Sequence, residues 1–156
     1  NYISKIAAAS SSEPQQRVLL DNSADDRREL AVFVHNRTTA FSALVDGAKP
    51  RQLCVVLPGD SAGAKNTLMN RFLTGDPALV VLNQRQPKLV DGIYSLNFRG
   101  RATVASVKNC QLIVDGARGA PPALQLGKVG HDRYNLDYSS PFTPLLAFAF
   151  AASQFM

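Results

Sequence analysis

The sequence predicts a mainly β fold: a closed antiparallel barrel threaded by one central, hydrophobic helix at the C-terminal end of the chain. Two observations predict it. Short apolar or alternating runs recur along the 156 residues with turn residues between them, and the last fourteen residues are rich in Ala, Leu and Phe. Many short strands separated by Gly, Asp and Pro are typical of antiparallel sandwiches and barrels. Closing the sheet around the helix removes free edges and buries the helix at the same time.

The predicted strands follow one another at roughly regular spacing. They are residues 2–6, 17–20, 30–35, 52–57, 78–83, 93–98, 102–107, 111–114, 123–129 and 133–138. Turn pairs such as Asp-Gly and Pro-Gly stand between many of them. Residues 7–16 and 60–65 are rich in small or polar side chains and are expected to be loops. There is no alternation of strand and helix patterns, so we do not expect a parallel sheet.

Two helices are predicted. The shorter covers residues 66–73, and the longer begins after Thr143, a suitable N-cap, with Pro144 in the first helical position. Apolar residues of the longer helix point in every direction around a helical wheel: Leu145, Leu146, Phe148, Phe150, Ala152 and Phe155. A helix that is apolar all round must be enclosed, and about twelve residues span only ~18 Å, too short for a ~30 Å bilayer core. We therefore expect the strands to surround it, with Ser153 and Gln154 as its only polar positions.

Composition favours a soluble globular domain. Apolar residues make up 46% of the chain and charged residues 19%, and no run of eighteen apolar residues occurs. The formal net charge of +5 favours anionic partners, but the basic residues form no block of the kind that tracks a nucleic-acid backbone. Cys54 and Cys110 lie in apolar runs and are expected to be reduced core thiols of a cytosolic or nuclear protein.

Catalytic chemistry is poorly supported. With only His35 and His131, the sequence predicts neither a metal site nor a Ser-His-Asp triad, and His131-Asp132 is interpreted as a turn. The stretch from Gly59 to Lys65 lacks the Gly-Lys-Ser/Thr ending of a phosphate-binding loop. We predict that the protein is not an enzyme and needs no cofactor.

Residues 98–112, Phe-Arg-Gly-Arg-Ala-Thr-Val-Ala-Ser-Val-Lys-Asn-Cys-Gln-Leu, closely resemble a signature of the Tubby family's C-terminal domain. Only Cys110 departs, where the family has Phe or Tyr. Segments at 18–22, 27–31, 50–59, 94–98, 126–129 and 134–138 fit the family in the same order, and the terminal helix resembles the one that threads the family's barrel. The resemblance implies that residues 1–156 are a single Tubby-like domain, with the family's first strands and last few residues lying outside them.

The resemblance also implies a ligand. In this family the domain binds phosphoinositides, chiefly phosphatidylinositol 4,5-bisphosphate, through a basic surface site. Tyr2-Ile-Ser-Lys5 is similar to the family's Tyr-x-Gly-Lys, which puts Lys5 on its headgroup lysine. Arg27, in Arg-x-Glu-Leu-Ala, falls on a further cationic contact, whereas the family's Arg two positions after the lysine falls on Ala7. The accessory basic residues that we expect to compensate are Arg28, Lys49 and Arg51. Arg101 and Lys108, within the signature, are interpreted as fixing strand ends by hydrogen bonds rather than as headgroup contacts.

The predicted function is non-catalytic tethering to phosphoinositide-bearing membrane by a monomeric domain. The family resemblance adds trafficking proteins, often ciliary ones, as partners, and a cytoplasmic location at the plasma or ciliary membrane or in the nucleus. Two alternatives stay open. One is a DNA-binding or transcription-linked protein, although we do not expect nucleic acid to be the main partner. The other is a protein-interaction barrel whose lipid site has weakened, as Ala7 suggests.

Overall fold

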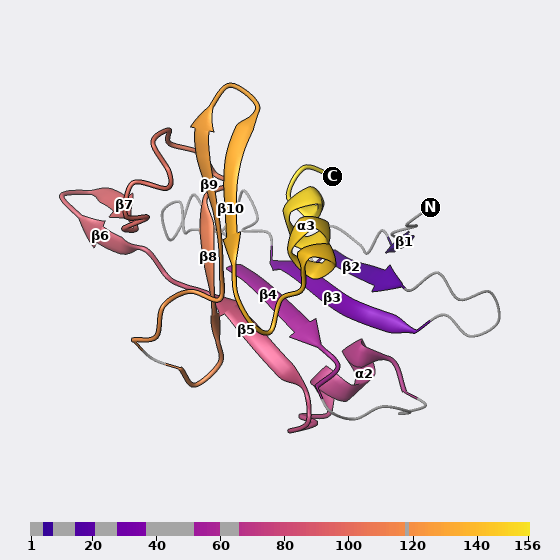
Figure 1. Cartoon of the computed structure of the whole chain (residues 1–156). Coiled ribbons are helices and arrows are strands. Elements are labelled where there is room, and N and C mark those ends of the chain that lie inside the picture. Colours follow the sequence, from indigo (N-terminus) through magenta and orange to yellow (C-terminus); the bar gives the residue numbers. More distant parts are fainter. Residues whose placement is uncertain (1–4, 8–14, 21–27, 37–51, 60–65, 118) are drawn as a thin grey trace. The chain divides into compact units, whose positions relative to one another are not determined.

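The computed structural model describes residues 5–7, 15–20, 28–36, 52–59, 66–117 and 119–156, which are mainly strands (Figure 1). The chain divides into two compact units, residues 1–83 and 84–156. The described part of each unit contains antiparallel strands and one helix. The predicted mainly β character, with a helix at the C-terminal end of the chain, is confirmed.

Five strands of the first unit follow one another as antiparallel neighbours. They are β1 (Lys5–Ala7), β2 (Gln15–Leu20), β3 (Glu29–Asn36), β4 (Gln52–Leu57) and β5 (Val80–Gln84). One row of opposed residues crosses them, from Lys5 through Val18, Val32 and Val56 to Val81. β-Branched residues favour this pleated geometry. Because β1 and β3 both run antiparallel to β2, they run parallel to each other, and Lys5 is level with Val32, in the middle of β3.

Helix α2 (Leu68–Leu73) covers one face of β3 and β4. Its Leu68 is buried with Val32, Val34 and Val56 in a core cluster. The helix begins two residues after the predicted start at 66 because Thr67 is its N-cap, whose hydroxyl accepts the Asn70 N–H at 3.2 Å. Burying each such Val or Leu side chain contributes about 1.5–3 kcal/mol, so the cluster fixes α2 on the sheet.

The second unit contains two separate sets of strands. A two-stranded hairpin is formed by β6 (Lys88–Val90) and β7 (Ile93–Ser95), and a three-stranded antiparallel sheet by β8 (Cys110–Val114), β9 (Leu124–Gly130) and β10 (Arg133–Tyr138). Cys110 is fully buried opposite Leu126, and Leu112 opposite Leu124. Both cysteines are free thiols, Cys110 buried and Cys54 half-buried, as predicted.

Two predicted strands need correction, and one strand was not predicted. Residues 102–107 form no strand: the backbone N–H groups of Thr103 and Val104 both bond to the Lys128 carbonyl, at 2.9 and 3.0 Å, so the segment lies irregularly against β9. The predicted strand at 93–98 ends at Ser95, and β6 was not predicted. The predicted loops at 60–65 and in most of 7–16 lie outside the described residues, although β2 begins within the latter, at Gln15.

Helix α3 (Pro144–Ser153) begins as predicted, with the Thr143 hydroxyl accepting the Leu146 N–H at 3.3 Å. Its buried stripe is Ala147, Phe150, Ala151 and Gln154, which are spaced at i, i+3, i+4 and i+7 along one face. Phe148, on the other side, is 70% exposed, so the second unit by itself leaves that side of the helix uncovered. Ser153 and Gln154, the only polar positions that the sequence offers on the helix, are buried, and both side chains are hydrogen-bonded.

The described strands of neither unit close into a ring. A closed barrel threaded by α3 therefore stays a prediction. In the described part of the chain, no helix has both the length and the hydropathy needed to cross a bilayer.

Candidate functional site

Two of the predicted cations lie on or next to the strands that flank β2 in the first unit's sheet. Lys5 is the first residue of β1, and Arg28, which is exposed, directly precedes β3. Two strand spacings separate β1 from β3, roughly 10 Å across the sheet, and Arg28 is four residues before Val32, the β3 residue level with Lys5, which adds roughly 13 Å along the strand. The other predicted cations, Arg27, Lys49 and Arg51, lie outside the described residues. Since Ala7 ends β1, this strand supplies one cation from its three residues.

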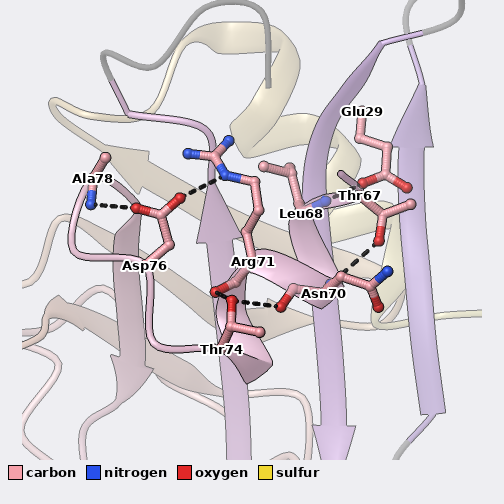
Figure 2. Close-up of polar contacts among 8 residues, drawn as sticks. All are labelled: Glu29, Thr67, Leu68, Asn70, Arg71, Thr74, Asp76 and Ala78. Carbon is pink, nitrogen blue, oxygen red and sulfur yellow. Dashed lines mark hydrogen bonds and ion pairs between the residues drawn. The ribbon is translucent and has the colours of Figure 1, made fainter. Parts of the chain in front are cut away.

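Glu29 fixes the point at which the chain enters β3 (Figure 2). Its carboxylate accepts a hydrogen bond from the backbone N–H of Leu68, the first residue of α2 and 39 positions away in sequence. The first N–H groups of a helix have no partner within the helix, and the positive end of its dipole favours an anion. The bond therefore ties the start of β3, immediately after Arg28, to the start of α2.

Sequence reasoning missed this role of Glu29. The available signal was the Glu of the Arg-x-Glu-Leu-Ala segment, which carried an acid into an otherwise apolar strand. Periodicity could not show that its partner is a helix N-terminus far along the chain.

Arg71, on α2, forms an ion pair that stabilises the local fold. Its Nε donates to the Asp76 carboxylate at 2.8 Å, and the other Asp76 oxygen accepts the Ala78 N–H at 2.9 Å (Figure 2). These bonds lower the pKa of Asp76, first through the Ala78 N–H and then through Arg71. Thr74 closes the helix by donating its hydroxyl to the Asn70 carbonyl at 3.0 Å. This arrangement holds the turn between α2 and β5.

Arg101, in the signature segment, forms a two-pronged ion pair with Asp137 of β10. Its Nε and Nη2 lie 2.9 and 2.7 Å from the two carboxylate oxygens. The hydrogen bond from Arg101 lowers the pKa of Asp137, Gln125 adds to this, and partial burial opposes it. The same hydrogen bond raises the pKa of Arg101. Gly100, with a φ of +78°, supplies the turn conformation that brings Arg101 back onto the sheet.

The Asp137 carboxylate also ends a row of polar side chains across the three-stranded sheet. Gln125 donates to it at 3.0 Å and accepts from Gln111 at 2.9 Å, and Gln111 accepts from Arg85 at 3.0 Å. These three strand residues are directly opposed in register. A partly buried polar row of this kind stabilises the fold only when its members are paired, and these are.

Lys108 and Asn109, later in the signature, are also structural. Lys108 donates to the Gln154 carbonyl at the end of α3, and its ammonium lies 5.2 Å from the centre of the Phe155 ring. Asn109 accepts the Lys128 N–H at 2.8 Å and donates to the Val104 carbonyl at 3.0 Å. The interpretation of Arg101 and Lys108 as residues that hold the fold by hydrogen bonds is confirmed.

His131 lies in the turn between β9 and β10, as predicted. Its Nδ1 is 3.1 Å from the Asp132 carboxylate, and both side chains are almost fully exposed. Among the described residues, no three His, Cys, Asp or Glu side chains gather in a way that would hold a metal ion.

Comparison with known proteins shows the family of the chain. The family model described as "Tub family" matches residues 5–156. The chain belongs to the Tub family. It is 34% identical to human Tubby-related protein 2 over 155 residues, which cover 91% of this chain and 29% of that protein. It is 32% identical to Tubby protein homolog 1 of Caenorhabditis briggsae over 86% of this chain and 35% of that protein.

A plant member of the Tub family matches a shorter segment. Tubby-like F-box protein 2 of Arabidopsis thaliana is 41% identical over 86 residues, 49% of this chain and 22% of that protein. The chain therefore spans about a third or less of the length of these relatives. Tub membership accounts for the signature at 98–112, whose turn, ion pair and side-chain bonds hold β9, β10 and α3 in place.

Proposed function

We propose that this chain is a non-catalytic domain that docks on phosphoinositide-bearing membrane through Lys5 and Arg27, with Arg28 as a third cation. The supporting observation is that β1, which carries Lys5, and β3, which follows Arg27 and Arg28 in the chain, both pair with β2. Family membership and the net charge of +5 support the same ligand class. We further propose that residues 1–156 act as one monomeric domain at the cytoplasmic face of the plasma or ciliary membrane.

Arg28 is important in this proposal because Ala7 stands where the family has an arginine. A chain with one cation on β1 needs another nearby to hold a headgroup with two or three phosphates. Arg28 is exposed, and the bond from Glu29 to Leu68 holds the backbone next to it. Arg presents a rigid fork of donors that matches phosphate geometry.

Vesicle flotation tests the proposal. The double variant Lys5→Ala, Arg27→Ala should bind vesicles containing phosphatidylinositol 4,5-bisphosphate about 30-fold more weakly, since each cation contributes about 1 kcal/mol to attraction by an anionic membrane. Arg28→Ala alone should lose roughly fivefold. Arg133→Ala, which removes an exposed cation of the second unit, is the matched control. Unchanged binding by the double variant would show that the proposed site is wrong.

Binding to duplex DNA and flotation of the unmodified chain separate the alternative functions. A DNA-binding protein would bind duplex DNA with an affinity that falls steeply with salt and does not compete with lipid. A protein-interaction domain with a weakened lipid site would leave flotation at background for the unmodified chain. A trafficking role is the larger function that we propose this docking serves, with membrane proteins as cargo.

A further inference from the structure

The β6–β7 hairpin carries large apolar side chains that face solvent. Leu89 is 60% exposed, Val90 53% and Tyr94 47%. Among the described strands these two pair only with each other, and Figure 1 shows the hairpin standing apart from the three-stranded sheet of the same unit. Isolated two-stranded hairpins are marginally stable in water, and clustered exposed apolar side chains mark interaction sites. The hairpin therefore has the character of a docking element.

The register puts large apolar residues on both faces of the hairpin. Leu89 is opposite Tyr94, and Val90 is opposite Ile93. Successive residues of a strand alternate between faces, so Leu89 and Tyr94 share one face, while Val90 belongs to the other face together with Lys88. A hairpin that packs on a protein surface needs only one apolar face. A hairpin that is apolar on both suits surroundings that enclose its tip, as the interfacial region of a bilayer does.

The turn makes this tip narrow and fixed. Asp91 and Gly92 have φ angles of +50° and +77°, the left-handed pair that a two-residue hairpin turn requires. Each strand has three residues, so the hairpin is roughly 10 Å long. That length matches the depth of about 5–10 Å to which interfacial elements enter a membrane.

The charges around the hairpin suit an anionic surface. Residues 84–101 contain four basic residues and a single acid, Asp91. Of the four, Arg85 and Arg101 take part in the bonds described above, whereas Lys88 and Arg99 are exposed close to the hairpin in sequence. Tyr and Lys or Arg are the residues that favour the headgroup level of a bilayer.

We propose that the β6–β7 hairpin is a membrane-insertion element, with Leu89, Val90 and Tyr94 entering the headgroup boundary of an anionic bilayer and Lys88 and Arg99 at the level of the phosphates. This inference rests on the proposed membrane docking but concerns a different contact. The hairpin supplies affinity for the bilayer, not for the soluble headgroup. Asp91, at the turn, opposes insertion and limits its depth.

A single tryptophan tests the contact directly, because the chain has none. Tyr94→Trp places it in the hairpin, and Tyr138→Trp, at a position that is 44% exposed in β10, is the matched control. With vesicles of phosphatidylcholine, phosphatidylserine and phosphatidylinositol 4,5-bisphosphate, the Tyr94→Trp emission should shift to the blue and be quenched by brominated acyl chains. A soluble inositol trisphosphate should cause no shift. Unchanged Tyr94→Trp emission on bound protein, or equal shifts in both variants, would overturn the inference.

Affinity measurements separate this inference from the proposed function. Leu89→Ser with Val90→Ser should weaken vesicle binding about tenfold and leave the affinity for inositol trisphosphate unchanged. Leu73→Ser, at a 70% exposed position of α2, is the matched control. Asp91→Asn keeps a residue that tolerates the turn and should strengthen vesicle binding two- to threefold, roughly the effect of removing one repelled charge near the surface.

Failure of the hairpin inference and failure of the headgroup site would give different experimental results. If the hairpin variant binds vesicles normally while Lys5→Ala, Arg27→Ala does not, the hairpin inference is wrong and the headgroup site stands. If the cation variant keeps full affinity for both vesicles and inositol trisphosphate, the headgroup site is wrong. A hairpin variant that loses affinity for inositol trisphosphate as well would also contradict the inference, because the hairpin would then act on the headgroup.

Discussion

The Arg101 guanidinium grips both oxygens of the Asp137 carboxylate, at 2.7 and 2.9 Å, and so joins the signature turn to the last strand, β10. Only a planar fork of donors makes both bonds at once. Because Gln125 also donates to this carboxylate, the pair is part of the polar row across the sheet rather than an isolated surface ion pair.

Arg101→Lys should lower the melting temperature by a few degrees, because a lysine ammonium keeps the charge and loses the second parallel bond. Calorimetry measures the change. Arg99→Lys, two positions earlier at an exposed site, is the matched control. Equal melting temperatures for Arg101→Lys and the unmodified chain would contradict this role.

Stability should fall in acid. The pKa values of Asp137 and Asp76 are lowered in the folded state, by hydrogen bonds from Arg101 and from the Ala78 N–H respectively. Their contribution is therefore fully present above the unfolded value of about 4 and is lost as the pH falls through the lower folded values. Urea denaturation between pH 2 and 7 should show this slope. In Asp137→Asn the slope should be shallower, and an identical slope would contradict the assignment.

Glu29→Gln should destabilise α2 by about 1 kcal/mol, since the Leu68 N–H keeps an acceptor but loses the charge at the helix start. Hydrogen exchange at residues of α2 should speed up more than exchange in the three-stranded sheet. Vesicle binding should also weaken, because the backbone next to Arg28 is less well held. Glu29→Asp, whose carboxylate is one carbon short of Leu68, is a useful second variant, with an intermediate effect expected.

Lys108→Met should loosen the end of α3. The ammonium that bonds to the Gln154 carbonyl and lies over the Phe155 ring is removed, while much of the side-chain length is kept. We expect a loss of about 1–2 kcal/mol of unfolding free energy, measured by urea denaturation. Lys88→Met, at an exposed lysine, should change it by less than about 0.5 kcal/mol. Equal effects at the two positions would contradict the structural role of Lys108.

Phe148 and Phe150 should differ sharply although they are two residues apart on α3. Phe150 is 1% exposed and Phe148 is 70% exposed. Phe150→Ala should cost about 3–5 kcal/mol of unfolding free energy, and Phe148→Ala within about 0.5 kcal/mol. A large cost for Phe148→Ala would instead show that the helix is enclosed on that side too, as the sequence first suggested.

Much of the local structure follows from residues that act on their neighbours. Thr143 and Pro144 fix the start of α3, and Asp91-Gly92 marks a tight turn, because capping and turn conformations depend on a few adjacent residues. The run at 102–107 was misinterpreted for the opposite reason. Its alternating pattern fits a strand, but two of its N–H groups bond to the single carbonyl of Lys128, which no local pattern contains.

For the candidate site, too, the sequence predicted one part, and contacts between distant residues decided the rest. The family resemblance indicated Lys5 and Arg27. Sequence patterning predicted strands at 2–6 and 30–35, close to the observed β1 and β3. It gave Glu29 no role, because the partner of its carboxylate is a helix N-terminus 39 residues away. It also did not single out the hairpin at 88–95, since whether an apolar residue is exposed depends on what the rest of the fold covers.

The sequence by itself determined the mainly β class, the helix at 144–153, the family and the basic residues proposed to meet a lipid headgroup. Tertiary structure alone decided which groups Arg101 and Lys108 bond to, that Phe148 faces solvent while Gln154 is buried, and that Leu89 and Tyr94 are exposed as a pair. The physical reason is the distance along the sequence over which each interaction acts. Caps, turns and periodicity act over a few residues, whereas ion pairing and burial depend on which distant segments the folded chain brings together.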